Sequence, residues 1–377
     1  MTPKEKFFLF KQSRHFCSVP WNHIKIDTDG SVATCVNGTN YLGNITKDEI
    51  DDILSNSDLL EIKKTLREDM PSINCKECQK LENTNDYSYK FLRDLYNPMF
   101  TKSTVDYNNS NEFILNGIDL HWSSTCNLKC ITCWANQSSS IAKELGIPIQ
   151  HTSSDAAEKI INYIVSNQHT LKEIYMSGGE PTLIKHNLNL LKRLRKDLNF
   201  TIRINTNLSF TDTNPVIEEL KKFPHVLFTI SADVADEKKF NYIRRGADWN
   251  VFLRNLETLQ KLHFSWRVNS VFFVATALYL TDTQEYFMRN FDINDFTINQ
   301  VGMGHNELRC RNLPHSVKQY VMNKLITHKE KYHFLTGQLD NCLKEVERPI
   351  EESYVSFFED IDNRAGTNWK TVFLELQ

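Results

Sequence analysis

The sequence predicts an α/β fold, in which strands alternate with helices and pair as a parallel sheet or barrel. The order of the elements along the chain supports this prediction. Between residues 111 and 302, short runs of β-type residues alternate with longer segments of helical periodicity. Parallel strands need a long crossover between them, and a helix supplies it. The six predicted strands are residues 117–122, 173–179, 201–207, 225–233, 265–274 and 295–302.

One helix between these strands is predicted from its leucine spacing. The segment 188–198 places Leu188, Leu191, Leu194 and Leu198 on one face, with basic residues largely opposite. We interpret the basic face as the solvated side of a barrel helix rather than a nucleic-acid surface.

The flanking segments differ from the central one, and three domains are predicted. Residues 1–110 hold a short β-like piece, a two-part helix around residues 48–69 and a Cys-Lys-Glu-Cys loop, which together indicate a separate small module. Residues 111–310 form the central βα region. Residues 311–377 are mainly helical and are expected to form a C-terminal helical extension.

Composition excludes several classes of protein. The 377 residues contain 44 Lys and Arg against 47 Asp and Glu, so no basic surplus indicates nucleic acid. The most apolar segment, 268–280, is shorter than the roughly 20 residues that span a bilayer, and the N-terminus lacks an apolar run of secretory length. We therefore expect a cytoplasmic protein without membrane partners. In that reducing compartment the nine cysteines indicate metal or cluster ligation rather than disulfides.

Three cysteines follow the first strand of the βα region, at the strand end where barrel active sites are built. Cys126, Cys130 and Cys133 have the spacing C-x3-C-x2-C. Clustered thiolates hold zinc or an iron–sulfur cluster, and a closed structural zinc site takes four ligands. Three ligands on a cluster of four irons leave one iron open to another molecule.

This triplet resembles the signature of the radical S-adenosylmethionine (SAM) enzymes. The segment MSGGEPTL at residues 176–183 ends the second strand and resembles the Gly-Gly-Glu-Pro motif of the same superfamily. The resemblance implies a partial (β/α)6 TIM-like barrel and a 4Fe-4S cluster that reductively cleaves SAM to a 5′-deoxyadenosyl radical. Gly178 and Gly179 let the backbone approach a ligand, and Glu180 supplies a carboxylate for the methionine ammonium. The chain departs from the pattern at Thr132, where an aromatic residue is common, and carries Trp134 after the last cysteine.

Further SAM contacts are expected at the tips of the later strands. A strand-end cap or a simple turn is the alternative for most of them, and Arg244 is preferred over its neighbour Arg245 as the partner of the methionine carboxylate. No catalytic residue is assigned beyond the cluster. The additional cofactor-binding positions are Asn205, Asn207, Ser231, Arg244, Val301 and Gly302.

A second cysteine set lies in residues 1–110 and resembles the auxiliary-cluster module called SPASM, or its shorter form, twitch. In most of that family the module follows the barrel, whereas here it precedes it. The C-terminal segment GTNWKTVFLEL also resembles the twitch-domain radical enzymes. The resemblance implies a second, closed 4Fe-4S cluster, and a four-cysteine zinc site remains an alternative. The expected ligands are Cys17, Cys35, Cys75 and Cys78, with a hairpin turn at Asp29 and Gly30 bringing the first two together.

The resemblance implies a radical enzyme that abstracts hydrogen from a peptide side chain and uses the auxiliary cluster in electron transfer. It also implies an electron donor such as a flavodoxin or ferredoxin. Two alternatives remain: radical oxidation or rearrangement of a small sugar-like or nucleoside substrate, and a non-catalytic cluster- or zinc-binding protein. Cys310 and Cys342 have no partner spacing and are expected to be buried thiols.

Overall fold

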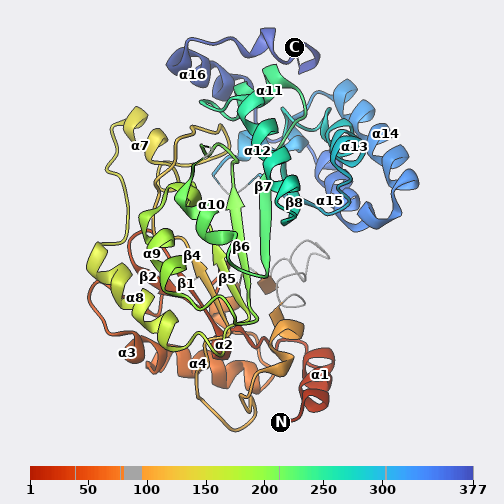
Figure 1. Ribbon diagram of the computed structural model, residues 1–377. Coiled ribbons are helices and arrows are strands. Elements are labelled where there is room, and N and C mark those ends of the chain that lie inside the picture. The colour runs from red at the N-terminus through yellow and green to blue at the C-terminus, as the bar shows by residue number, and fades with distance from the viewer. Residues whose placement is uncertain (39, 77, 80–95, 212, 302–303, 377) are drawn as a thin grey trace. The chain divides into compact units, whose positions relative to one another are not determined.

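The computed structural model describes residues 1–38, 40–76, 78–79, 96–211, 213–301 and 304–376 (Figure 1). The chain forms two compact units. Unit 1 consists of Met1–Cys126, Ala135–Asn205 and Thr211–Leu227, and unit 2 consists of Asn127–Trp134, Thr206–Phe210 and Phe228–Gln377.

Unit 1 contains a mostly parallel sheet with the strand order β3-β2-β1-β4-β5-β6. Strands β1 and β2 form an antiparallel hairpin whose turn is tightened by Asp29, which accepts hydrogen bonds from the backbone and hydroxyl of Ser31 (2.9 and 3.0 Å). On its other edge β1 pairs in parallel with β4, followed by β5 and β6. The strands are β1 (His23–Ile26), β2 (Ser31–Ala33), β3 (Gly43–Asn44), β4 (Gly117–Leu120), β5 (Glu173–Met176) and β6 (Thr201–Thr206).

The side chains of β1, β4, β5 and β6 alternate between an apolar face and a polar one. The apolar side chains are fully buried, and helices α8, α9 and α10, which lie beside these strands in Figure 1, each bury an apolar face of their own. The core of unit 1 therefore lies on the apolar face. Its members are Ile24, Ile26, Ile118, Leu120, Ile174, Met176, Ile202 and Ile204.

Five of the described helices of unit 1 begin at side-chain caps, whereas α2, α3 and α9 do not. Thr2 and Glu5 form a capping box at the first helix, and Asn56, Ser138, Ser153 and Asn214 each accept a backbone N–H at the start of a later helix. The helices are α1 (Pro3–Gln12), α2 (Val19–Asn22), α3 (Ile50–Leu54), α4 (Ser57–Arg67), α7 (Ser139–Leu145), α8 (Ser154–Ser166), α9 (Lys185–Arg193) and α10 (Pro215–Leu220), with short 3-10 turns η1 (Ile73–Cys75), η2 (Phe100–Lys102) and η3 (Pro181–Leu183).

The predicted helix over residues 188–198 is wrong at its C-terminal end. Helix α9 ends at Arg193, and Leu194 is extended. The ammonium of Lys196 donates hydrogen bonds to the carbonyls of Leu191 and Leu194 (2.8 and 2.6 Å), which satisfies groups that another helical turn would have used. Leucine spacing does not reveal such a side-chain cap.

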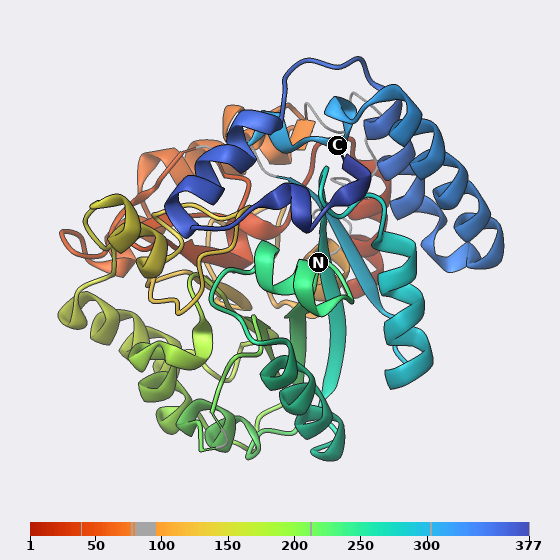
Figure 2. The ribbon, with the colours of Figure 1, turned by 90° about the horizontal axis from the view of Figure 1, so that it is seen from above.

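Unit 2 continues the α/β pattern with strands in the order β7-β8-β9, where β8 and β9 are parallel. Helices α14 and α15 lie side by side in Figures 1 and 2. The elements are β7 (Val226–Ser231), β8 (Ser265–Phe272), β9 (Phe296–Gln300), α11 (Glu237–Ile243), α12 (Trp249–Lys261), α13 (Leu280–Phe291), α14 (His315–Lys331), α15 (Thr336–Glu347) and α16 (Val355–Ala365), with 3-10 turns η4 (Asn306–Leu308), η5 (Cys310–Asn312), η6 (His333–Leu335), η7 (Trp369–Thr371) and η8 (Leu374–Leu376).

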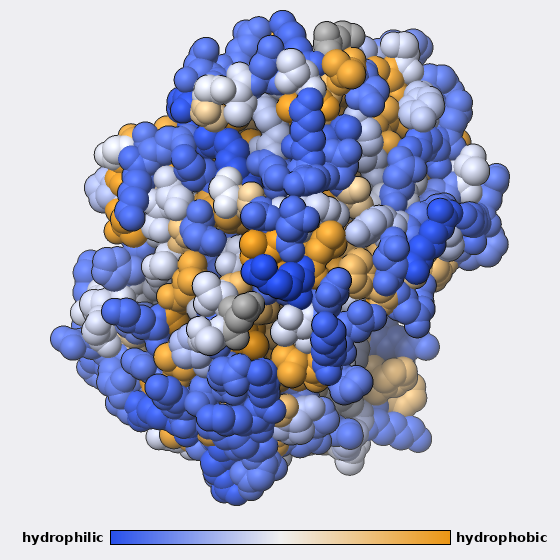
Figure 3. Space-filling model, turned by 45° about the horizontal axis from the view of Figure 1, so that its top comes forward, coloured by the Kyte–Doolittle hydropathy of each residue, from blue (hydrophilic) through white to orange (hydrophobic). Residues whose placement is uncertain are grey.

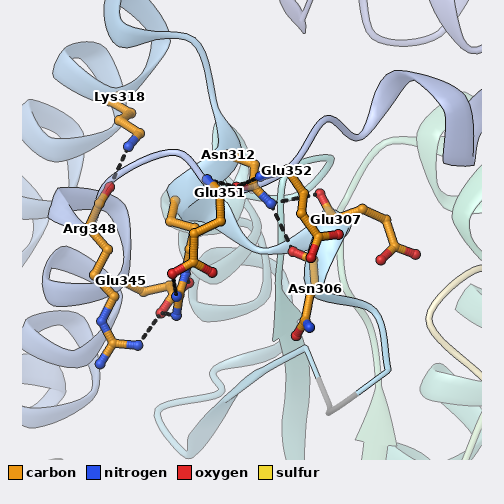
Figure 4. A network of polar contacts seen from close by, with 9 residues as sticks. Asn306, Glu307, Asn312, Lys318, Glu345, Arg348, Glu351 and Glu352 are labelled. Atoms are coloured by element: carbon orange, nitrogen blue, oxygen red, sulfur yellow. Dashed lines mark hydrogen bonds and ion pairs between the residues drawn. The ribbon is translucent and has the colours of Figure 1, made fainter.

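An ionic network ties the segment after β9 to the C-terminal helices (Figure 4). The guanidinium of Arg311 donates to both carboxylate oxygens of buried Glu345 (2.8 and 3.0 Å) and to Glu351 (2.8 Å). Asn312 donates to backbone carbonyls of η4 and accepts the backbone N–H groups of Glu351 and Glu352 (3.0 and 3.1 Å). The bidentate pair fixes the position of η5 against α15.

The α/β class with a mostly parallel sheet is confirmed, and each of the six predicted strands contains an observed one. The three-domain division stays a prediction. Hydrophilic residues make up most of the face shown in Figure 3. Within the residues that the structure describes, no helix combines the length and apolar content that would let it cross a membrane.

Candidate functional site

The Gly-Gly-Glu-Pro segment after β5 lies directly against the backbone that leads into Cys126. The N–H of Gly179 donates to the carbonyl of Ser123 (3.0 Å), and the N–H of Glu180 donates to the carbonyl of Thr125 (2.7 Å). A Cβ on Gly178 would lie 2.7 Å from the Ser123 oxygen, and one on Gly179 would lie 2.1 Å from the Thr125 oxygen. Gly178 also has a φ of +102°. Both positions therefore require glycine.

Glu180 is buried, and its carboxylate is oriented by the residue two positions later. Its Oε1 accepts the backbone N–H of Thr182 (3.1 Å) and the hydroxyl of the same residue (2.7 Å). Asn214 in turn donates to the carbonyl of Thr182 (3.0 Å). A carboxylate held in this way is positioned before any ligand arrives.

The backbone of Cys126 is held by serines at the start of α7. Its N–H donates to the hydroxyl oxygen of Ser139 (3.1 Å), while the hydroxyls of Ser139 and Ser140 donate to its carbonyl (3.1 and 2.8 Å). Sequence reasoning missed these serines. The Ser138–Ser140 run shortly after the triplet is the signal that could have indicated them, because serine is a preferred helix cap.

In unit 2, the loop carrying Cys130 and Cys133 runs along the end of α11. The N–H groups of Lys129 and Ile131 donate to the carbonyls of Arg245 and Ile243 (2.8 and 2.9 Å). Burial raises the pKa of Cys130, and the positive charge of Arg244 offsets part of that rise. Burial and the neighbouring Cys130 raise the pKa of Cys133 to about 12. Such thiols bind as thiolates only when a cation compensates their charge, which fits an iron–sulfur cluster.

Arg244 is buried beside these cysteines. Its guanidinium pairs with Asp233 (2.7 Å) and lies 3.9 Å from the sulfur of Cys130. Arg245 is directed differently and donates to the carbonyl of Lys129 (3.1 Å). The structure thus distinguishes the two arginines, and the preferred one lies next to Cys130.

Trp134 packs against His305. Their rings stack at 4.7 Å with an interplanar angle of 17°, and a Cβ on Gly304 would lie 3.3 Å from the indole nitrogen. Sequence reasoning did not find His305, because 171 residues separate it from the triplet and no motif marks it.

The remaining predicted contacts fall in both units. Asn205, near the end of β6, belongs to unit 1, whereas Asn207, Ser231 and Val301 belong to unit 2. Asn207 donates to the side-chain carbonyl of Asn127, the residue after Cys126 (3.1 Å). Ser231 ends β7 and Val301 is buried. Gly302 lies outside the described residues.

All four cysteines of the second set line one cavity in unit 1, together with His15, Asn37, Asn74 and Tyr96. Burial, together with the charge of the other thiols, raises the pKa of Cys17 well above its usual value and that of Cys35 to about 11. The amide of Asn37 donates to the sulfur of Cys78 (3.5 Å). Four soft donors around one cavity fit a closed iron–sulfur cluster. Among the described residues, no three His, Cys, Asp or Glu side chains group as a site for a single metal ion.

A three-cysteine loop after β4 and four further cysteines around a cavity fit an iron–sulfur protein. Residues 120–283 match the model of the Radical SAM superfamily, and residues 17–79 match the SPASM iron-sulfur cluster-binding domain. The chain therefore carries a Radical SAM domain and an N-terminal SPASM domain, and the two domains indicate 4Fe-4S clusters. The predicted resemblance is confirmed.

The chain is similar to a probable GTP 3′,8-cyclase of Pyrococcus abyssi, with 24% identity over 147 residues. That match covers 39% of this chain and 44% of the cyclase, so the chain spans less than half of the relative's length.

Two solved structures are also similar. They are native anSMEcpe with bound AdoMet and Cp18Cys peptide (20% identity, TM-score 0.44, 59% of this chain and 61% of that one) and Streptococcus suis SuiB bound to precursor peptide SuiA (15% identity, TM-score 0.42, 84% and 69%). Likenesses this weak do not identify a substrate.

Proposed function

We propose that this protein is a radical SAM enzyme that reductively cleaves S-adenosylmethionine and removes hydrogen from a peptide side chain. The observation that carries the proposal is the fit of the Gly-Gly-Glu-Pro segment onto residues 123–125, which lead into Cys126. When bound, the three-cysteine 4Fe-4S cluster supplies the electron that breaks a carbon–sulfur bond of SAM, and the adenosyl fragment then accepts hydrogen from the substrate.

The protein's own residues bind and orient the cofactor in this proposal. Glu180, fixed by Thr182, accepts hydrogen bonds from the methionine ammonium. Arg244, fixed by Asp233, is the proposed partner of the methionine carboxylate. The further proposed contacts are Gly178, Gly179, Asn205, Asn207, Ser231, Val301 and Gly302.

Cys17, Cys35, Cys75 and Cys78 are the proposed ligands of the auxiliary 4Fe-4S cluster, which passes electrons. Their shared cavity and the SPASM match support this assignment. The electron that starts the reaction comes from a donor such as a flavodoxin or ferredoxin.

A nucleoside or other small molecule is the second candidate substrate. The similarity to the probable GTP 3′,8-cyclase over 147 residues favours it. The peptide assignment draws its support from the SPASM match.

The class of reaction is tested by anaerobic reconstitution with iron and sulfide, followed by addition of SAM and dithionite. We expect 5′-deoxyadenosine to form, and to be lost when Cys126, Cys130 and Cys133 are all replaced by alanine. Cys342→Ala is the matched control, because that thiol is buried in α15 and belongs to neither cysteine set. If the reconstituted wild-type protein binds iron and yields no 5′-deoxyadenosine, the proposed function is wrong.

A further inference from the structure

One face of the parallel sheet in unit 1 is polar across four adjacent strands. Register places Lys25 of β1, Asp119 of β4, Tyr175 of β5 and Arg203 of β6 in one row. Both faces of a parallel sheet are normally covered by apolar packing, and barrel interiors are filled mainly by branched apolar side chains. A polar row in this position contributes little to a core, and it therefore requires another explanation.

The charges on this face are balanced in pairs. Lys25 pairs with Asp27 (2.9 Å), buried His23 pairs with Asp119 (3.2 Å), and Arg203 pairs with Glu173 (2.8 Å). Burial lowers the pKa of His121, the residue that follows β4, to about 4, so that its imidazole is neutral at neutral pH. The net charge of the face is zero with His23 protonated and minus one with His23 neutral.

Several polar atoms on the face lack partners although they are buried. Among the described residues, no group donates to or accepts from Asp119 Oδ2, His121 Nε2, Arg203 Nε or Ser177 Oγ. Leaving a buried donor or acceptor unpaired costs about 1–3 kcal/mol, so four such atoms on one face would be costly without a function. They offer both donors and acceptors.

These atoms lie next to the proposed cofactor loops along the chain. Ser177 immediately precedes Gly178, and His121 lies five residues before Cys126. Asp119 lies on β4 and Arg203 on β6, whereas His121 follows β4 and Ser177 follows β5. Strands β4 and β6 are two strand spacings apart, about 10 Å, which is the length of about three residues of extended chain.

We infer that Asp119, His121, Ser177 and Arg203 bind backbone amide groups of an uncharged stretch of a peptide substrate. The inference rests on the proposed function and specifies its substrate class. A peptide group carries one donor and one acceptor per residue and no charge, which matches the mixed, charge-balanced face. A nucleoside triphosphate would need an excess of positive charge, but each cation here already has a carboxylate partner.

The test measures binding by the anaerobically reconstituted protein without reductant, so that no cleavage occurs. The probes are a pool of N-acetylated, C-amidated hexapeptides without charged side chains, and GTP. Retained probe is quantified by mass spectrometry after gel filtration.

Two variants test the face. His121→Phe keeps an aromatic ring packed against Tyr175 (ring centroids 6.3 Å apart in the wild type) and removes the unpaired nitrogen. Arg203→Lys keeps a cation opposite Glu173 and removes the Nε–H donor. Arg193→Met is the matched control, because that arginine pairs with Glu158 on an exposed helix surface.

We expect the wild type and Arg193→Met to retain peptides, and both face variants to retain at least tenfold less. His121→Phe should also have a melting temperature equal to or above the wild type, which separates lost binding from lost folding. Equal peptide retention by wild type and both variants, or no retained peptide at all, would overturn the inference. Retention of GTP that is lost in Arg203→Lys would overturn it in favour of a nucleotide. Formation of 5′-deoxyadenosine by the same preparation reports separately on the proposed function.

Discussion

Replacing Gly179 with alanine should disable the cofactor loop while leaving most of the fold in place. The added Cβ would lie 2.1 Å from the Thr125 oxygen, whereas real Cβ contacts are essentially never below 3.0 Å. The two backbones must therefore separate by about 0.9 Å. That shift breaks the hydrogen bonds from Gly179 to Ser123 and from Glu180 to Thr125. At about 1 kcal/mol each, their loss lowers the free energy of unfolding by about 2 kcal/mol.

The effect on activity should be larger than the effect on stability. A displacement of about 1 Å near a reacting group can reduce the rate about 100-fold, so we expect 5′-deoxyadenosine formation to fall by about that factor. Iron content should remain near the wild-type value, because no cysteine is changed. The assay measures initial rates of 5′-deoxyadenosine formation, with iron determined on the same samples and unfolding followed in urea.

Gly337→Ala is the matched control for this change. Gly337 lies in the first turn of α15, and a Cβ there would meet nothing within 4 Å. The same added methyl should stabilise the protein by about 0.5–1 kcal/mol and leave the rate unchanged. Wild-type rate and stability in Gly179→Ala would refute the steric argument.

Three further predictions concern the auxiliary cluster, the C-terminal network and the buried histidine. Replacing Cys75 and Cys78 with alanine should lower iron from about eight to about four atoms per chain while SAM cleavage persists, because the two clusters are proposed to be independent. Arg311→Met should destabilise the protein by about 3–5 kcal/mol, measured by urea unfolding, because it leaves Glu345 buried without its bidentate partner. Burial opposes ionisation of both His23 and Asp119, but their attraction outweighs it, raising the pKa of His23 and lowering that of Asp119. Their contribution should be complete between about pH 4 and 6.5, and melting temperatures should show its loss as pH rises through the raised pKa of His23 or falls through the lowered pKa of Asp119.

Each of these predictions has its own control and contrary outcome. Unchanged iron content in the double-cysteine variant would overturn the auxiliary-site assignment. Arg364→Met removes an exposed i,i+4 pair with Asp360 and should cost no more than about 0.5 kcal/mol; an equal loss in Arg311→Met would contradict the buried-network argument. Asp119→Asn should remove the His23-dependent part of the pH profile, and an unaltered profile would show that the pair does not control it.

The sequence allowed the α/β class and the six central strands to be predicted, because periodicity is a local property of the chain. The cysteine spacing and the Gly-Gly-Glu segment were also local, and the domain matches bear out the family that they indicated. The C-terminal end of α9 was missed because the Lys196 side chain caps it from beyond the helix.

Contacts between distant segments could not be predicted in this way. The parallel pairing of β1 with β4 joins residues 94 positions apart, and nothing in either strand specifies the other. The pairing of Arg244 with Asp233 and the stacking of Trp134 on His305 likewise depend on the folded backbone. The alternation of polar and apolar residues in β1, β4, β5 and β6 is present in the sequence. Only the strand register shows that the polar residues of the four strands lie in one row.

That pattern puts the apolar core and the proposed peptide-binding face at alternate positions of the same strands. Apart from Thr206 at the end of β6, even-numbered residues in these strands form the apolar core, whereas odd-numbered ones carry the polar face. An evolving descendant could therefore exchange odd-numbered side chains for a new substrate while its folding core stayed intact. The same separation gives a protein engineer a defined set of positions to randomise in search of altered specificity.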